Sequence, residues 1–498
     1  MNAVERVVDV IVPVRRDVCA AKRCVASILA SRNDTKHAVI AVIDPEVERE
    51  FRASAGELAT DARLTLVRTG RPLDYASATN RGWSTHADRD VVLLQADAEV
   101  HGDWLDRLAA HADGADAGIV GTFTNVAGNA TYPRPDTGNR LPEDATPAAL
   151  DALFAATNRG QCAAVAAVFG PCLYVKRACI AATGNLRTVA TDDGYAAEID
   201  FCLRAASAGY RCVVAGDVFV ANDGEGSFGN RARHAEGHAA TSALANLHPG
   251  HASALRELAQ HESTRTLARR VDLARLAASP RPAILLVSHA WGGGIRRHMD
   301  ELSALARHRA DVLYLEPANA DTVKLHWPWQ GEAFAAWFRL PGDLPALAGT
   351  LREIGVARLH FHHVHGLPRS ILQLPQAAGI AYDCTLHDYF AICPQYHLSD
   401  EHGRYCGEPD AAGCAACIAR RPAQWDLDIG AWRAVLGEFL RGAERVIAPS
   451  QDVATRMRRY LPTLAIDVWP HLETAPSRSP AIIRVVTLGN LSPEKGLH

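Results

Sequence analysis

The chain has 498 residues, of which 48% are apolar and 22% charged, and its formal net charge is −4. This composition is that of an ordinary globular protein of about three domains, and the charge excludes bulk attraction to nucleic acid or to an anionic membrane. No apolar run approaches the roughly 18 residues of a membrane span, and the N-terminus lacks the regions of a signal peptide. We therefore expect a cytoplasmic protein with no nucleic-acid partner, and peripheral contact with the inner membrane stays open.

The N-terminal part alternates strand-like and helical segments, which predicts a parallel α/β sheet. Ligands of such sheets bind beyond the carboxyl ends of the strands, where Pro13, Val14 and Asp44 lie. Asp44 before Pro45 is by itself also an ordinary turn residue. Three apolar runs predict the first strands, namely Val7 to Val14, Val39 to Ile43 and Leu64 to Val67.

A fourth apolar run, Val91 to Leu94, predicts a strand buried on both faces, and two acids follow it, Asp97 and Glu99. Residues two apart point the same way while a chain stays extended, so both carboxylates could face one cation. Mg2+ and Mn2+ prefer oxygen ligands and often share them with phosphates. The stretch therefore favours a metal–diphosphate site, and the alternative is a solvated acidic turn.

An ordered set of motifs over about residues 7 to 230 resembles the family 2 glycosyltransferases, which have the GT-A fold for nucleotide-diphospho-sugar transfer. No single motif is specific, but the ordered set is. The matching stretches are Val12 to Val14, Asp44, Asn80 to Gly82, Asp97 to Glu99, Gly170 to Tyr174, Glu198 to Arg204, and Val218 to Phe228.

The resemblance implies roles for individual residues. The donor nucleotide sugar would be bound by Pro13, Val14, Asp44, Asn80 and Asp97, and the Mg2+ or Mn2+ by Asp97, Glu99 and Asn222. A carboxylate must also take the proton of the acceptor hydroxyl, and Glu198 is the first choice, with Asp200 the second. Both acids open a helix predicted from Glu198 to Ala208, where acids also complement the helix dipole.

Two positions depart from the family pattern. Ala197 stands where many relatives carry another acid, and Asn222 stands where relatives often carry a metal-binding histidine. Asn offers a carbonyl oxygen, so a cation could still bind there more weakly, and Asp223 is a possible substitute. These departures leave room for a weakened or inactive enzyme.

The second half is predicted to be a separate α/β unit after a helical extension, residues 231–281, that ends in the linker Ser279 to Pro282. The strand Ala283 to Val287 leads into Gly292, Gly293 and Gly294, whose backbone N–H groups could meet a phosphate or sugar. Further strands are expected at Val312 to Leu315, Leu359 to His363, Ala381 to Leu386 and Val446 to Ala448, and Ser450 is expected to cap a helix.

This half resembles the Rossmann-like, N-terminal, acceptor-side domain of a family 4 GT-B glycosyltransferase. The match rests on Gly292 to Gly294, His362-His363, Leu386 to Tyr389, Ala448 to Ser450 and Pro470-His471. It implies four regions: 1–230 as the GT-A domain, 231–281 as the extension, 282–472 as the GT-B domain, and 473–498 as the start of a truncated donor domain. Without that donor domain we do not expect this half to transfer sugar.

Four cysteines lie within twenty-five residues of one another, at Cys393, Cys406, Cys414 and Cys417. Their number and the C-x2-C pair fit a structural Zn2+ site. Disulfides would also fit, but not in a reducing compartment, and His387, His397 and His402 are possible substitute ligands.

The leading hypothesis is a metal-dependent, inverting glycosyltransferase. It would move a sugar from a nucleotide-sugar donor to a glycan or lipid-linked glycan acceptor in surface polysaccharide synthesis. A non-catalytic carbohydrate-binding or scaffolding protein is the alternative, favoured by Ala197 and Asn222. A nucleotidyltransferase ranks lower, because Val14 to Asp17 lacks the glycine-rich loop it would need.

Overall fold

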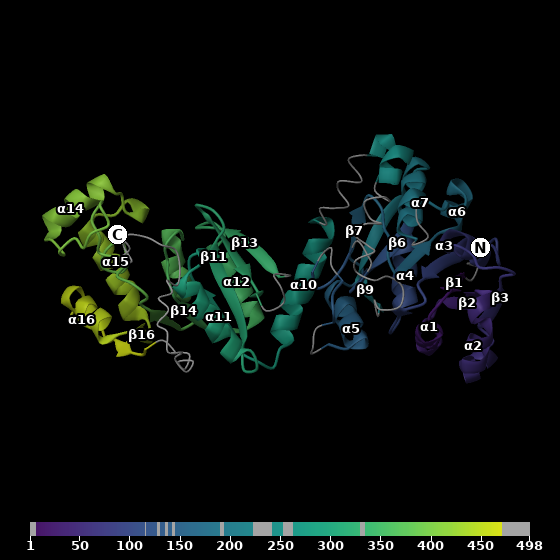
Figure 1. The fold of residues 1–498 in the computed structure, drawn as a ribbon, viewed down its shortest axis with the longest axis horizontal. Coiled ribbons are helices and arrows are strands. Elements are labelled where there is room, and N and C mark those ends of the chain that lie inside the picture. Colours follow the sequence, from purple (N-terminus) through teal and green to yellow (C-terminus); the bar gives the residue numbers. More distant parts are fainter. Residues whose placement is uncertain are drawn as a thin grey trace, which may run out of the picture. The chain divides into compact units, whose positions relative to one another are not determined.

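The computed structural model describes residues 6–114, 116–126, 130–134, 138–141, 145–189, 194–222, 242–251, 262–328 and 334–470. The chain divides into two units, Met1–Ala274 and Arg275–His498 (Figure 1). The expected boundary at residue 230 and the expected fragment 473–498 lie outside the described residues, so both stay predictions. Among the described helices, none is long and apolar enough to cross a membrane.

The first unit is a mixed α/β domain in which all four expected strands are present. Its elements are β1 (Val7–Val14), α1 (Val18–Ala30), β2 (Lys36–Ile43), α2 (Pro45–Ala55), η1 (Gly56–Thr60), β3 (Leu64–Arg68), α3 (Tyr75–Trp83), β4 (Asp90–Leu94), β5 (Ala98–Glu99), α4 (Trp104–Ala112), β6 (Ala117–Thr124), α5 (Pro147–Thr157), β7 (Cys162–Val165), β8 (Cys172–Val175), α6 (Arg177–Thr183), α7 (Tyr195–Ser207), β9 (Arg211–Asn222), η2 (Pro249–His251) and α10 (Glu262–Ala278).

The sheet of this unit runs in the order β3-β2-β1-β4-β8-β6-β9-β5, with β7 beside β9. The strands β3, β2, β1 and β4 are parallel, so their carboxyl ends meet at one edge. β8 is antiparallel to both β4 and β6, and β5 is antiparallel to the end of β9. The edge beyond β1 and β4 is therefore also reached by the start of β8 and the end of β9.

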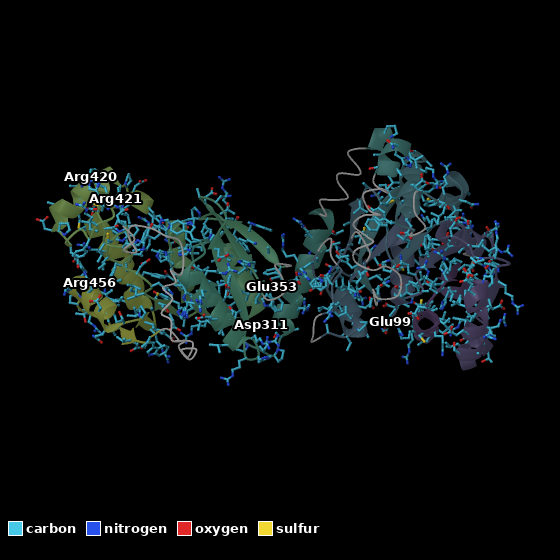
Figure 2. The ribbon with its side chains drawn as sticks, viewed as in Figure 1. Glu99, Asp311, Glu353, Arg420, Arg421 and Arg456 are labelled. Carbon is cyan, nitrogen blue, oxygen red and sulfur yellow. The ribbon has the colours of Figure 1, made fainter. Side chains whose placement is uncertain are left out.

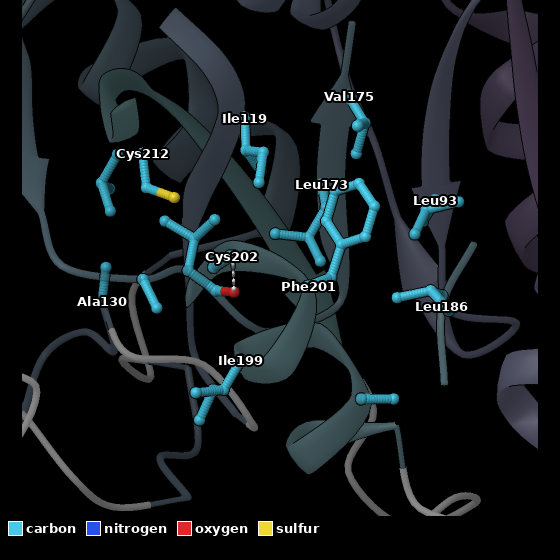
Figure 3. Packing of buried hydrophobic residues seen from close by; sticks show 14 of the residues in the cluster. Leu93, Ile119, Ala130, Leu173, Val175, Leu186, Ile199, Phe201, Cys202 and Cys212 are labelled. Atoms are coloured by element: carbon cyan, nitrogen blue, oxygen red, sulfur yellow. Dashed lines mark hydrogen bonds between the residues drawn. The ribbon is translucent and has the colours of Figure 1, made fainter. Parts of the chain in front are cut away.

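Period-two alternation in the strands builds a core on each face of the sheet. In β1, Ile11 packs in one cluster, whereas Val10 and Val12 pack in the other. Helix α7 covers the first face with Phe201 and Cys202, and the Cys202 thiol donates to the Val168 carbonyl at 3.4 Å (Figure 3). Each fully buried large apolar side chain contributes about 1.5–3 kcal/mol.

The second unit is also α/β, and every strand expected there is present with small differences at the ends. Its elements are β10 (Ala283–Val287), α11 (Gly294–Ala306), β11 (Asp311–Pro317), β12 (Thr322–His326), β13 (Ala335–Arg339), α12 (Leu344–Ile354), β14 (Val356–Phe361), η4 (Arg369–Gln373), α13 (Leu374–Ala378), β15 (Tyr382–Thr385), α14 (Ala411–Arg420), η5 (Gln424–Asp426), α15 (Ile429–Gly442), β16 (Arg445–Ala448), α16 (Gln451–Tyr460) and β17 (Asp467–Val468).

The second sheet runs in the order β13-β12-β11-β10-β14-β15-β16-β17. All neighbours from β11 to β17 are parallel, and β12 and β13 add an antiparallel edge. Ser450 caps α16 as expected, since its hydroxyl accepts from the Val453 N–H at 3.3 Å. The strand expected to run to His363 ends at Phe361 instead, so His362 and His363 lie just past the carboxyl end of β14.

Candidate functional site

Asp97 lies in a turn at the carboxyl end of β4. The turn is fixed by the Gln95 N–H, which donates to the Pro171 carbonyl at 2.8 Å, and by the Ala98 N–H, which donates to the Gln95 carbonyl at 3.0 Å. The Asp97 side chain is only 7% exposed, and its Oδ1 accepts from Asn222 Nδ2 at 2.9 Å. Its Oδ2 is buried without a hydrogen-bond partner among the described residues. A buried, unsatisfied carboxylate oxygen is costly unless something binds it, so this atom marks a candidate cation ligand.

The backbone between Asp97 and Glu99 is not extended, although the predicted shared cation site assumed that it is. The segment turns at residues 96 and 97, so the rule for extended residues two apart does not apply here. The Glu99 carboxylate (labelled in Figure 2) lies 3.1 Å from His101 Nε2, and its side chain is 43% exposed. Its role as a metal ligand stays a prediction.

Asn222 is held at the end of β9, opposite Ala98 of β5. Asn125 fixes its backbone on both sides: the Asn222 N–H donates to Asn125 Oδ1 at 2.7 Å, and its carbonyl accepts from Asn125 Nδ2 at 2.8 Å. The Asn222 amide nitrogen faces Asp97. A metal-binding role for Asn222 would therefore need the amide to turn its oxygen toward the cation.

Glu198 is buried in the first turn of α7, where both of its oxygens accept hydrogen bonds. Tyr75 donates its hydroxyl to Oε1 at 2.6 Å, and the Gly170 N–H donates to Oε2 at 3.1 Å. Burial of the hydroxyl, and then the negative charge of Glu198, raise the pKa of Tyr75 well above its usual value. Tyr75 therefore keeps its hydroxyl proton and remains the donor in this hydrogen bond.

The segment Gly170-Pro171 connects the two acids that the sequence singles out. Its Gly170 N–H binds Glu198, and its Pro171 carbonyl binds the Gln95 N–H two residues before Asp97. Gly170 has φ +143°, a conformation that side chains rarely adopt, which suits glycine at this close approach. Glu198 and the turn that carries Asp97 thus both contact one short segment just before β8.

Asp200 lies two residues further along α7, and its charge is already balanced. Its Oδ2 accepts from Arg204 Nε at 2.9 Å, and its Oδ1 lies 2.8 Å from His248 Nε2. The side chain is 1% exposed. As second choice for the catalytic base, Asp200 stays a prediction, but these contacts give it a clear structural role.

The residues predicted to bind the donor lie at the carboxyl edge of the sheet or close to it. Pro13 and Val14 are buried at the end of β1, where the Val14 carbonyl accepts from the Asp44 N–H at 3.0 Å. Asp44 caps α2 through the Glu46 N–H at 3.3 Å, which is the turn role that its sequence context favours. Asn80 instead pairs both ends of its amide with the backbone of Leu186, at 2.9 and 3.0 Å.

We expect Gly194→Ala to disturb the site through Tyr75. Gly194 precedes α7 with φ +83°, and an added Cβ would lie 2.7 Å from the Tyr75 ring, so stability should fall by about 1–3 kcal/mol. Gly184→Ala is the matched control, because Gly184 has φ +84° with nothing near its Cβ. Urea unfolding should show a loss in both variants, and sugar-donor turnover should drop only in Gly194→Ala. Equal turnover would contradict the positioning of Glu198 by Tyr75.

The predicted glycine loop of the second unit is exposed between β10 and α11. Gly293 precedes α11 with φ +99°, and no atom lies near a Cβ built on Gly292, Gly293 or Gly294. The loop therefore leaves backbone groups accessible beyond the end of a parallel strand, as the sequence predicts.

We expect the second unit to lose stability as the pH falls from about 6.5 to about 4. Burial, and then the nearby His363 and His365, lower the pKa of His289 to about 4. In this window the unfolded chain binds a proton that the folded unit does not, which costs at most about 3 kcal/mol. His289→Asn keeps an acceptor for the Trp291 N–H and should flatten the pH dependence of urea unfolding. An unchanged slope would contradict the prediction.

The four clustered cysteines lie near one another without disulfides. Burial, and then the neighbouring Cys406, Cys417 and Cys414, raise the pKa of the Cys393 thiol to about 11. Arg421 (Figure 2) donates to the Cys417 sulfur at 3.3 Å. Among the described residues, no three of these sulfurs lie within 4.8 Å of one another, so zinc would have to draw them together.

We expect Cys414→Ser to lower the zinc content of the purified chain by one equivalent, because tetrahedral Zn2+ needs all four ligands. Elemental analysis measures this content. Cys19→Ser, at an exposed cysteine of the first unit, is the control and should keep the wild-type content. Unchanged zinc in Cys414→Ser would remove the proposed site.

Several solved structures show a partial likeness to the chain. A mannosyltransferase from Pyrobaculum calidifontis, in complex with GDP-Man and Mn2+, has a TM-score of 0.35 at 20% identity and covers 60% of this chain and 80% of its own. S. aureus TarS 1-349 has a TM-score of 0.34 at 10% identity, with 87% of this chain and 91% of its own covered. TM-scores this low support no conclusion about this chain.

Two sequence comparisons gave matches. An uncharacterized protein, y4gI of Sinorhizobium fredii, is 27% identical over 225 residues, which is 41% of this chain and 23% of the relative. This chain thus spans about a quarter of that relative's length. Residues 9–165, which contain β4 and Asp97, match the family model described as Glycosyl transferase family 2. This part of the first unit is therefore similar to the family 2 glycosyltransferases, and the match supports an enzyme that transfers a sugar.

Proposed function

We propose that the first unit transfers a sugar from a nucleotide-sugar donor to a glycan or lipid-linked glycan acceptor, with inversion, and with Mg2+ or Mn2+. Surface polysaccharide synthesis is the proposed setting. The family match over residues 9–165 supports sugar transfer. The single observation that carries the metal-dependent form is the buried Asp97 Oδ2, which has no hydrogen-bond partner among the described residues.

The three predicted metal ligands fit a hard divalent cation only in part. Asp97 offers a carboxylate oxygen that has no hydrogen-bond partner among the described residues. Asn222 would have to turn its amide oxygen toward the cation, and one Glu99 oxygen now contacts His101. When bound at the donor diphosphate, such a cation supplies Lewis-acid stabilisation of the leaving group. The chain's own contribution is to hold Asp97 in a fixed turn, through Gln95 and Pro171.

The proposed base is Glu198, which takes the proton of the acceptor hydroxyl. Tyr75 and the Gly170 N–H orient this carboxylate by donating a hydrogen bond to Oε1 and to Oε2. The segment Gly170-Pro171 contacts Glu198 and the turn that carries Asp97, which supports placing the base and the cation ligand in one site. We propose that the acceptor enters from the Glu198 side, opposite the leaving diphosphate, so that the displacement inverts the anomeric configuration.

The test is a nucleotide-sugar panel on the full chain with Mn2+, with Mg2+ and with a chelator. We expect turnover of one donor that the chelator removes, and NMR of the product should show the anomeric configuration inverted. A non-catalytic carbohydrate-binding role is the second candidate, favoured because Asn222 turns its amide N–H toward Asp97. Nucleotide binding without turnover of any donor would favour that role.

We also propose that the second unit is the acceptor-side part of a family 4-like GT-B glycosyltransferase. The support is the run of parallel strands from β11 to β17 and the accessible glycine loop after β10. Glycan binding to the full chain, with Gly293→Ala as the variant, tests this proposal. Unchanged binding in the variant would count against a role for the loop.

A further inference from the structure

Three histidines meet at the carboxyl edge of the second sheet. His298 lies on α11, His362 directly follows β14, and His387 follows β15. The neighbouring strands β10 and β14 are far apart in the sequence, and ligands of doubly wound sheets bind where the strand order reverses in this way. One ligand nitrogen from each ring lies within 4.8 Å of the other two.

The spacing of the three rings fits a shared metal ion. The ring centroids of His298 and His362 are 5.5 Å apart, and each of these rings lies 5.3 Å from that of His387. Three imidazoles on one tetrahedral Zn2+, with Zn–N bonds of about 2.0–2.1 Å, would place their centroids about 5 Å apart. The rings therefore already form a triangle of nearly the required size.

The closest contact in the triangle also suits a cation. His362 Nδ1 lies 3.0 Å from His387 Nε2, so one of these nitrogens must carry a proton that the other accepts. In a tetrahedral zinc site two ligand nitrogens are about 3.3 Å apart, from the same bond lengths. A metal ion could replace that shared proton with little movement of either ring.

A neighbouring histidine restricts the ring of His362. His360 stacks on His362 at 4.3 Å with the ring planes 10° apart, and His360 Nε2 lies 2.8 Å from Thr385 Oγ1. His362 and His387 also line a pocket together with Asp388. A metal bound there would keep one position open toward that pocket, as catalytic or ligand-binding zinc does.

We propose that His298, His362 and His387 bind one Zn2+-class ion, meaning Zn2+, Co2+ or Ni2+, with the fourth position open to an oxygen ligand. Imidazole nitrogen suits these metals, whereas Mg2+ prefers oxygen. The site differs from Asp97 in the first unit and from the four clustered cysteines in its donor atom, which is an imidazole nitrogen in all three ligands, and it takes His387 as its own ligand.

The experiment uses the full chain without a histidine tag and Co2+ as the probe. In a Cys414→Ser background, we expect one equivalent of Co2+ with d–d absorption and without thiolate charge-transfer bands. His298→Gln should weaken this binding at least tenfold, and His308→Gln, at an exposed histidine on the same unit, should not. Added Zn2+ should raise the unfolding midpoint of the parent and not of His298→Gln.

His387→Gln provides a second variant with the same expected loss. Circular dichroism checks that each variant is folded, and both variants change half-buried histidines and leave the buried His362 in place. Co2+ uptake that is equal in the parent, His298→Gln and His387→Gln would overturn the proposal. So would a Cys414→Ser parent that takes up no Co2+ and gains no stability from Zn2+.

Discussion

Asp97→Asn should lower metal-dependent donor turnover by about 10³-fold, since a cation that stabilises the leaving diphosphate contributes several kcal/mol. The variant should stay folded, because the amide oxygen can still accept from Asn222 Nδ2 where Asp97 Oδ1 does now. The substitution removes the negative charge of residue 97. A divalent cation should therefore bind more weakly beside the buried position that Oδ2 occupies now.

The measurement is turnover of the best donor against Mn2+ concentration, with binding of the matching nucleoside diphosphate followed by calorimetry. Nucleotide binding should become independent of Mn2+ in Asp97→Asn. Glu99→Gln is the matched comparison, and we expect less than a tenfold loss there because Glu99 is half-exposed and paired with His101. Wild-type Mn2+ dependence in Asp97→Asn would contradict the assignment of the metal to this carboxylate.

The strands could be predicted from the sequence because their signal is local. Buried parallel strands are continuous apolar runs, so β1 and β10 begin and end where the sequence predicts, at Val7–Val14 and Ala283–Val287. Helix ends were less predictable. The helix expected to open at Glu198 begins at Tyr195, because Gly194 provides its entry with a positive φ rather than an acidic cap.

The contacts of the site residues were less predictable, because they depend on residues far apart in the chain. Asn80 bonds to Leu186, more than a hundred residues away, and nothing near Asn80 indicates this partner. Tyr75 donates a hydrogen bond to Glu198 from 123 positions away, and no local sequence pattern predicts this contact either. The orientation expected for Glu99 relative to Asp97 rested on a local rule for extended chains. The turn at residues 96 and 97 means that this rule does not apply.

Glu198→Gln should lower kcat for sugar transfer to the acceptor by about 10²–10⁴-fold, the usual contribution of a general base. The change should leave the fold intact, since the oxygen of the introduced amide can accept the Gly170 N–H while its NH2 group donates to the Tyr75 hydroxyl. The Gly170 N–H thus keeps its acceptor and the Tyr75 hydroxyl keeps a hydrogen bond to residue 198, whereas the proton-accepting carboxylate is lost.

Two further variants separate a catalytic loss from a structural one. Glu198→Ala leaves the Tyr75 hydroxyl and the Gly170 N–H without their acceptor, so it should also lower the free energy of unfolding by about 1–3 kcal/mol. Tyr75→Phe removes one donor and keeps the base, so turnover should fall far less than in Glu198→Gln. Steady-state kinetics should show the Glu198→Gln loss in kcat with the donor KM unchanged, because the base acts on the acceptor. A raised donor KM with an unchanged kcat would instead make Glu198 a group that positions the donor, and the proton would then need another acceptor at this edge of the sheet.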